Sequence, residues 1–289
     1  MLLEFKKALS PSAISFSGIP LSFSSDVMKQ LVLHWQQQLK NKQASLRVSG
    51  IMSEIRPFDH STNDYLNALY VNEKLVLWPG TAITLRDAKI MDDAVVMFVS
   101  DISYPFISAL NNVALRKSLG MESMSPLRPP LAICTYSITS DNYIVLTVRG
   151  NTTNVYPGRL YGQGGNPTTT SVDIVQHQVE EMQDELLLEP GEIFTGTFRF
   201  FGIVEDLESF PGKPDLIGTV QLKFSSKELL ERFETRPPEN RPPDVADIRL
   251  VSFDREGLHH LLLEETKALD YCPPAHGGLL LLARREFGN

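Results

Sequence analysis

The side chains best suited to chemistry are the carboxylates crowded into residues 180–185. Glu181 and Glu185 are four residues apart and Asp184 lies three after Glu181, so on a helix the three would share one edge. Like charges at that spacing repel by roughly a few tenths of a kcal/mol per pair. Such an edge is either a solvated surface or a place where a cation relieves the repulsion, and hard divalent cations prefer carboxylate oxygens. Helix spacing alone favours the solvated surface.

A helix is expected to carry these carboxylates over residues 172–189. Its apolar residues recur at spacings of three and four, which is typical of one helix face packed on a core: Val172, Val175, Val179, Met182 and Leu186. Ser171 is expected to cap the N-terminus, and Pro190 with Gly191 is expected to stop the helix. The expected length is roughly five turns.

The glycine pair Gly164 and Gly165 precedes this helix. Glycine lets backbone groups approach a ligand closely, and a loop that leads into a helix N-terminus suits phosphate. The alternative is an ordinary flexible turn. Arg149 ends a strand-like run ahead of the pair, where its guanidinium either reaches a diphosphate or forms a surface salt bridge.

These residues resemble the box of the Nudix hydrolases. In that family a Gly and a Glu are followed by Arg-Glu-hydrophobic-any-Glu-Glu-any-Gly-hydrophobic, and Glu-Met-Gln-Asp-Glu at residues 181–185 is similar to its metal-binding core. This chain departs from the box at three places. Glu180 stands in place of the Arg, Leu187 in place of the final Gly, and the earlier box Glu is lost within residues 168–173.

The Asp within the core resembles the divergent box of the animal Nudix proteins that hydrolyse UDP-glucose. Similar features extend over roughly residues 95–285, at 201–203, 222–226 and 271–278. The resemblance implies Mg2+-dependent hydrolysis of UDP-glucose to UMP and glucose 1-phosphate, with Mn2+ as an alternative ion. It also implies catalytic and metal-binding roles for Glu181, Asp184 and Glu185, with backbone of the glycine pair as a further ligand at Gly165.

The contacts to the substrate are expected to come from several segments. Residues 101–112 place two aromatics and two amides around a proline break, so they either line a pocket for a base or sugar or form a loop-to-helix junction. Tyr104 and Asn111 are the expected pocket residues there. Arg149 and Gly164 are the expected contacts near the diphosphate.

The order of elements is what the Nudix fold implies, an α+β protein in which a mixed β-sheet lies between helices as an α/β/α sandwich. Prolines at 126, 129 and 130 mark a boundary, so residues 1–127 are expected to form an N-terminal α/β extension packed on a hydrolase domain at 128–289. In the extension we expect a helix at 25–39 and strands at 46–51, 74–78 and 94–99. In the hydrolase domain we expect strands at 131–138, 143–149, 194–204, 216–224 and 248–253, and further helices at 226–233, 255–266 and 275–285.

Composition excludes several classes of protein. The 289 residues carry a net charge of −8 without a basic stripe, which disfavours nucleic acid as a partner. No apolar run approaches the 18 or so residues of a membrane span, and the first residues do not resemble a signal peptide. Cys134 and Cys272 belong to no CxxC pair and are expected to be free thiols in a reducing cytoplasm.

Two other classes of function remain open. A catalytically weak, Nudix-shaped module that binds or senses a nucleotide sugar is favoured by the loss of the box Arg and first Glu, and disfavoured by the retained acidic edge. A protein-interaction domain without a ligand would leave thermal stability unchanged on addition of Mg2+. The sugar, the base, the general base, the number of metal ions and the oligomeric state are left open.

Overall fold

The computed structural model describes residues 2–18, 81–103, 129–150, 153, 156–168, 172–206, 212–237, 241–265 and 270–288. Several expected features lie outside these ranges. They are the helix at 25–39, the strands at 46–51 and 74–78, residues 104–112 with Tyr104 and Asn111, and Ser171. Their placement stays a prediction.

The main sheet is mixed and has the strand order β1-β9-β10-β5-β6-β11. Neighbouring strands are antiparallel except β10 and β5, which are parallel. Two short strands extend it, with β7 on β6 and β8 on β5. The bounds are β1 Leu2–Leu9, β5 Ala132–Ile138, β6 Tyr143–Arg149, β7 Leu160–Tyr161, β8 Gln163–Gly165, β9 Ile193–Asp206, β10 Lys213–Leu222 and β11 Val245–Ser252. The expected hairpin of residues 131–149 is confirmed, with Asn142 in its turn at φ 67°.

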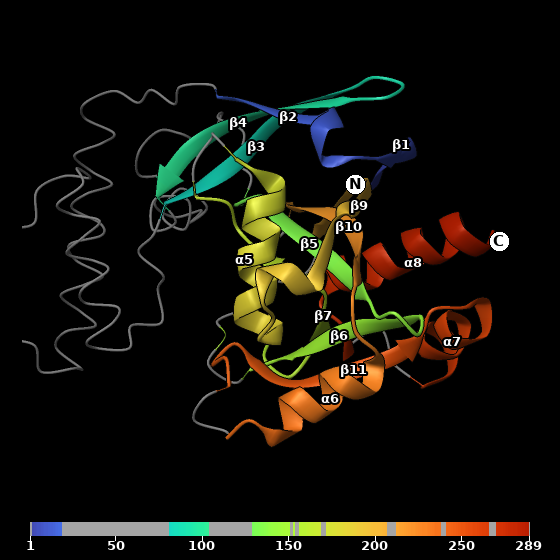
Figure 1. Ribbon diagram of the computed structural model, residues 1–289. Coiled ribbons are helices and arrows are strands. Elements are labelled where there is room, and N and C mark those ends of the chain that lie inside the picture. The colour runs from blue at the N-terminus through green and yellow to red at the C-terminus, as the bar shows by residue number, and fades with distance from the viewer. Residues whose placement is uncertain are drawn as a thin grey trace, which may run out of the picture.

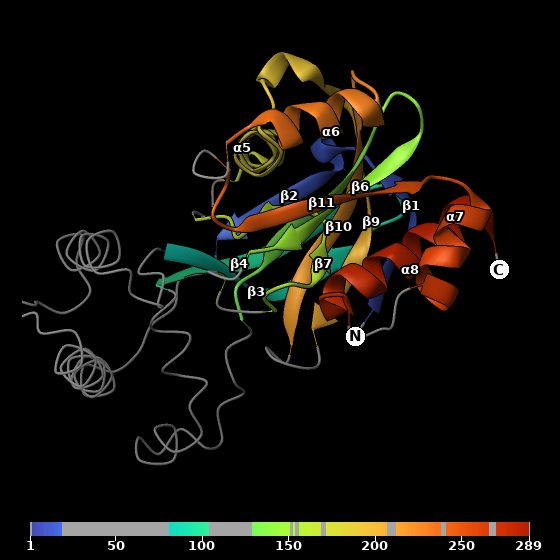
Figure 2. The same cartoon turned by 90° about the horizontal axis from the view of Figure 1, so that it is seen from below.

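Helices cover both faces of this sheet. On one side lie α5 (Ile174–Leu186) and α6 (Ser226–Thr235), and on the other lie α7 (Arg255–His259) and α8 (Pro273–Phe287) (Figures 1 and 2). Strand alternation serves both faces, since Ile133 packs in the core beneath α5 whereas Tyr136 packs in the core beneath α8. The expected α/β/α sandwich with a mixed sheet is therefore confirmed.

The N-terminal residues form a second sheet and one edge of the main sheet. Strand β4 (Val95–Ser103) lies between β2 (Ile14–Gly18) and β3 (Thr81–Ile90), and a turn of 3-10 helix, Pro11–Ala13, separates β1 from β2. The strand expected at 94–99 is confirmed and is longer. Strand β1 pairs with β9, so residues before 127 hydrogen-bond to strands after it. The division at 127 and 128 itself stays a prediction.

The C-terminal helices differ in detail from the expected ones. The helix expected at 255–266 ends as α-helix at His259 and continues as a π-helix, His260–Glu265. Helix α8 begins at Pro273 instead of residue 275, because proline suits the first turn, where its missing N–H costs no hydrogen bond. Cys134 and Cys272 are both buried and free, as expected. In the part of the chain that the structure describes, no helix is long and apolar enough to cross a membrane.

Candidate functional site

The glycine pair lies in a strand. Gly164 and Gly165 belong to β8 and pair with Cys134 and Ile133 of β5, so the expected turn is wrong at these positions. Gly164 has φ 150°, and a Cβ there would overlap the backbone carbonyl of Ile133. Only glycine lets the two strands come this close.

Helix α5 is shorter than expected at both ends. Asp173, and not Ser171, caps its N-terminus by accepting a hydrogen bond from the Gln176 N–H at 3.0 Å. This carboxylate takes one of the donors that a phosphate would use at the helix N-terminus. The helix ends after 13 residues because Leu187 adopts the left-handed conformation at φ 62°. Pro190 comes after that stop and begins a 3-10 turn.

Pairing of β8 with β5 brings the glycine pair against two of the helix carboxylates. Gly164 donates its N–H to Oε2 of Glu185 at 3.3 Å. The Glu181 carboxyl group lies on Gly165, since a Cβ at that position would be 2.5 Å from Cδ and 2.7 Å from Oε2 of Glu181. The structure thus gathers four of the predicted site residues, and their roles stay predictions.

The acidic edge of α5 is divided between two environments. Glu181 and Glu185 are partly buried, whereas Asp184 and Glu180 are exposed. Glu180 accepts a hydrogen bond from the Gln176 amide at 2.7 Å, so the residue that replaces the box Arg interacts on the solvent side of the helix. Among the described residues, no group of three or more His, Cys, Asp and Glu side chains could hold a metal ion.

Burial and repulsion disfavour charge on the two inward carboxylates. Burial raises the pKa of Glu181 to about 7, and repulsion from Asp184 and then Asp244 contributes. Burial also raises the pKa of Glu185 well above its usual range, repulsion from Glu181 adds to this, and the positive charge of Arg149 acts against it. Both carboxyl groups therefore resist ionisation, and a cation bound between them would favour their charged forms.

These residues fit a divalent cation. The donors are carboxylate oxygens, which such ions prefer, and the missing Cβ of Gly165 leaves the space in which the Glu181 carboxyl group lies. Glu181 and Glu185 would hold the ion. Asp184 stands on the exposed side of the same helix turn, and the Gly165 carbonyl would be a further ligand.

His177 is a neighbour that the sequence patterns did not single out. Its Nδ1 lies 3.9 Å from Oε1 of Glu181, one helix turn away, and its side chain is only 16% exposed. Burial lowers the pKa of the imidazole. Its interaction with the backbone of Gly165 acts in the opposite direction and offsets part of this shift. The i, i+4 spacing from Glu181 was the signal that could have found it.

Arg149 ends β6, close enough to Glu185 to favour the charged form of that carboxyl group. Its guanidinium lies 5.4 Å from the centroid of the Tyr161 ring, which suits a cation–π contact. The reach of Arg149 toward a diphosphate stays a prediction. Its position beside the carboxylate pair is compatible with that role.

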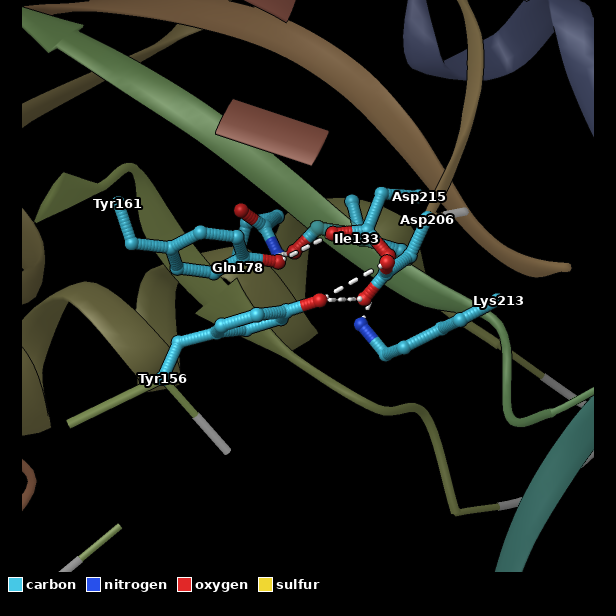
Figure 3. A network of polar contacts seen from close by, with 7 residues as sticks. All are labelled: Ile133, Tyr156, Tyr161, Gln178, Asp206, Lys213 and Asp215. Carbon is cyan, nitrogen blue, oxygen red and sulfur yellow. Dashed lines mark hydrogen bonds and ion pairs between the residues drawn. The ribbon is translucent and has the colours of Figure 1, made fainter. Parts of the chain in front are cut away.

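A second group of acidic residues lies where β9 ends and β10 begins (Figure 3). Tyr161 donates to Asp215, which also receives Lys213 Nζ at 2.7 Å. Tyr156 donates to both carboxylate oxygens of Asp206, at 2.9 and 2.8 Å. We call these five residues the tyrosine–aspartate network. Strand β9 ends at Asp206 and β10 begins at Lys213, so the connection between them is shorter than the gap left by the strands expected at 194–204 and 216–224.

No protein-family model matches the sequence, and no curated protein matches it. Several solved structures have a similar arrangement. A hydrolase of the NUDIX family from Clostridium perfringens is 11% identical, with a TM-score of 0.33, over 53% of this chain and 97% of that one. A bifunctional NMN adenylyltransferase/ADP ribose pyrophosphatase from Francisella tularensis, in complex with AMP and a Mn ion, is 16% identical, with a TM-score of 0.39, over 63% of this chain and 48% of that one. These are similarities of fold at low sequence identity.

Proposed function

We propose that this chain is a Nudix-type hydrolase that cleaves the diphosphate of a nucleotide sugar, with UDP-glucose giving UMP and glucose 1-phosphate. The observation that carries the proposal is the convergence of Glu181 and Glu185 on the glycine pair. These contacts bring the carboxylates of α5 against the glycines of β8. The retained Glu-Met-Gln-Asp-Glu core supports the same activity.

The proposal assigns a role to each residue of the site. A divalent cation, Mg2+ or Mn2+, supplies neutralisation of the diphosphate charge and lowers the pKa of a water molecule when bound. Glu181 and Glu185 hold the cation from the buried side, and Asp184 holds it or a water from the exposed side. Arg149 orients the diphosphate through its guanidinium, in line with its place beside Glu185. Tyr104 and Asn111 are proposed to contact the base or sugar.

A second candidate is a module that binds a nucleotide sugar without hydrolysing it. Glu180 is exposed and stands in place of the box Arg, so this position offers no positively charged side chain to orient Glu181 and Glu185. This favours the second candidate. The crowding of Glu181 and Glu185 disfavours it. Binding alone does not require a pair of carboxylates whose pKa values are raised.

The test is a substrate panel. We would incubate the protein with Mg2+ and separately with Mn2+, using nucleotide sugars, dinucleotides and nucleoside triphosphates, and measure released phosphomonoesters. Turnover confined to UDP-sugars supports the proposed substrate class. Turnover of dinucleotides or triphosphates instead would support a hydrolase and reject the sugar specificity.

The free thiols Cys134 and Cys272 support a reducing location, for which we propose the cytoplasm.

A further inference from the structure

The imidazole of His177 touches both halves of the candidate site. Its Nδ1 lies 3.9 Å from Oε1 of Glu181, in α5, and the backbone of Gly165, in β8, is close enough to raise the pKa of the imidazole. The Glu181 carboxyl group in turn lies directly on Gly165. The three residues therefore form a closed set of contacts that joins the helix to the glycine strand.

This arrangement restricts two groups at once. A glutamate side chain with three rotatable bonds samples several rotamers unless its neighbours hold it. The Glu181 side chain is 30% exposed, and the imidazole lies 3.9 Å from its Oε1, one helix turn before it. The same ring anchors the backbone of Gly165, so loss of the ring would loosen both the carboxylate and the strand.

The contact between α5 and the strands beneath it also contains buried polar atoms without hydrogen-bond partners. Within the described residues, four buried side-chain atoms have no hydrogen-bond partner: Thr135 Oγ1, Asn166 Oδ1, His177 Nε2 and Gln178 Oε1. His177 and Gln178 come from α5, Thr135 comes from β5, and Asn166 directly follows β8. Unmet polar groups are costly in a packed interior, so the few polar contacts that hold this helix on the strands matter for its position.

We infer that His177 is a positioning residue, which holds the Glu181 carboxylate and the Gly165 backbone in the arrangement that takes up a divalent cation. The inference rests on the proposed function, because it presumes that Glu181 and Gly165 belong to the cation site. It adds a residue outside the stretch that resembles the Nudix core. Partners of this kind are worth about 10- to 100-fold in metal affinity in other sites.

The experiment measures Mn2+ affinity of the full chain by titration calorimetry, together with thermal unfolding in the absence of metal. His177→Phe keeps a ring and removes both nitrogens, and His177→Leu takes its place if the phenylalanine variant is not folded. His177→Asn keeps a donor near the position of Nδ1. We expect about 10- to 100-fold weaker Mn2+ binding in His177→Phe and recovery of most of that loss in His177→Asn.

The matched control is Gln178→Met, in the same helix and equally part of its contact with the sheet. Gln178 donates to the carbonyl of Ile133 at 3.1 Å, so its loss should lower thermal stability and leave Mn2+ affinity unchanged. Wild-type affinity in His177→Phe, or equal losses in His177→Asn and His177→Phe, would overturn the positioning role. An equal loss of Mn2+ affinity in Gln178→Met would also overturn it, because the effect would then be one of stability.

Failure of the proposed function has a different signature. In that case the wild type binds no Mn2+, or Glu185→Gln binds it as tightly as the wild type does. If Glu185→Gln weakens binding while His177→Phe does not, the cation site stands and only the role of His177 is lost.

Discussion

Among the described residues, two pairs of poorly exposed carboxylates lie in opposite electrostatic environments. Asp206 and Asp215 in the tyrosine–aspartate network are almost fully buried, yet tyrosine hydroxyls donate to both and Lys213 neutralises one. Glu181 and Glu185 both lie against the glycine pair, where Gly164 donates a long hydrogen bond to Glu185 and the pKa values of both are raised. The first pair is satisfied by the protein itself. The second keeps a mutual repulsion that Arg149 offsets only in part, which is the feature that the proposed cation would relieve.

The difference shows two electrostatic environments for the same kind of side chain, one that stabilises the fold and one that we propose for chemistry. Buried charges that are paired and hydrogen-bonded hold elements together, whereas buried charges that repel each other cost stability. Tyr156 and Tyr161 come from the segment before β8, and their aspartates come from β9 and β10. The network therefore connects the segment that carries the glycine pair to the hairpin beside it.

The largest contrast is expected from removing one charge in each pair. Asp215→Asn leaves Lys213 without its partner and should lower the free energy of unfolding by about 3 kcal/mol, the lower end for a broken buried pair, since Lys213 keeps some contact with solvent. Glu185→Gln should leave the metal-free protein as stable or make it more stable. Urea unfolding of both variants would measure this. Equal destabilisation of the two would mean that the pairs do not differ.

Gly165→Ala should have the next largest effect. Its Cβ would lie 2.5 Å from Cδ of Glu181, so the carboxyl group must move. We expect a loss of about 1–3 kcal/mol in unfolding free energy, typical of an overpacked site, together with weaker Mn2+ binding. Gly191→Ala is the control, because nothing lies within 4 Å of a Cβ there. Unchanged Mn2+ affinity in Gly165→Ala would show that Glu181 is not held where the structure places it.

The smallest expected effect is a dependence of stability on pH. The pKa of Glu181 is about 7 in the folded protein and about 4.5 when unfolded, so the folded state binds more protons between these values. Stability of the metal-free protein should therefore fall as pH rises from about 4.5 to about 7. Glu181→Gln should make that part of the curve less steep, with Glu185 contributing the slope that remains, and saturating Mg2+ should flatten it further. Chemical unfolding at several pH values would test this, and an identical slope in the variant would assign the effect to other groups.

Local patterns predicted much of the fold. The hairpin of β5 and β6 was readable because β-branched residues flank an Asp-Asn turn, and α5 was readable from its apolar spacing. Strand β8 was not, since glycine has low strand propensity and the pairing partner lies far away in the sequence. Strand β1 was missed because its pairing partner also lies far away in the sequence, near residue 200.

The candidate site was predictable only where its residues share one helix. Spacing places Glu181, Asp184 and Glu185 on one helix edge, and their site roles came from the Nudix resemblance, whereas the contact of Glu181 with Gly165 needs the tertiary fold. The Tyr156–Asp206 and Tyr161–Asp215 bonds join residues 50 and 54 apart, which no local pattern encodes. The N-terminal end of α5 was misplaced because Asp and Ser are equally typical N-caps, and the C-terminal end because Leu187 adopts a left-handed conformation that usually favours glycine.

Phosphomonoester release from UDP-glucose by the wild type and by Glu181→Gln tests the central claim most directly. Loss of a carboxylate that holds the cation should cost on the order of a hundredfold or more in rate, since each 1.36 kcal/mol of transition-state stabilisation is about a factor of ten. UDP-glucose should still bind to the variant, and the exposed-site control Glu180→Gln should keep its activity. A wild type that binds UDP-glucose yet releases no phosphomonoester at any Mg2+ or Mn2+ concentration would contradict the proposed hydrolase.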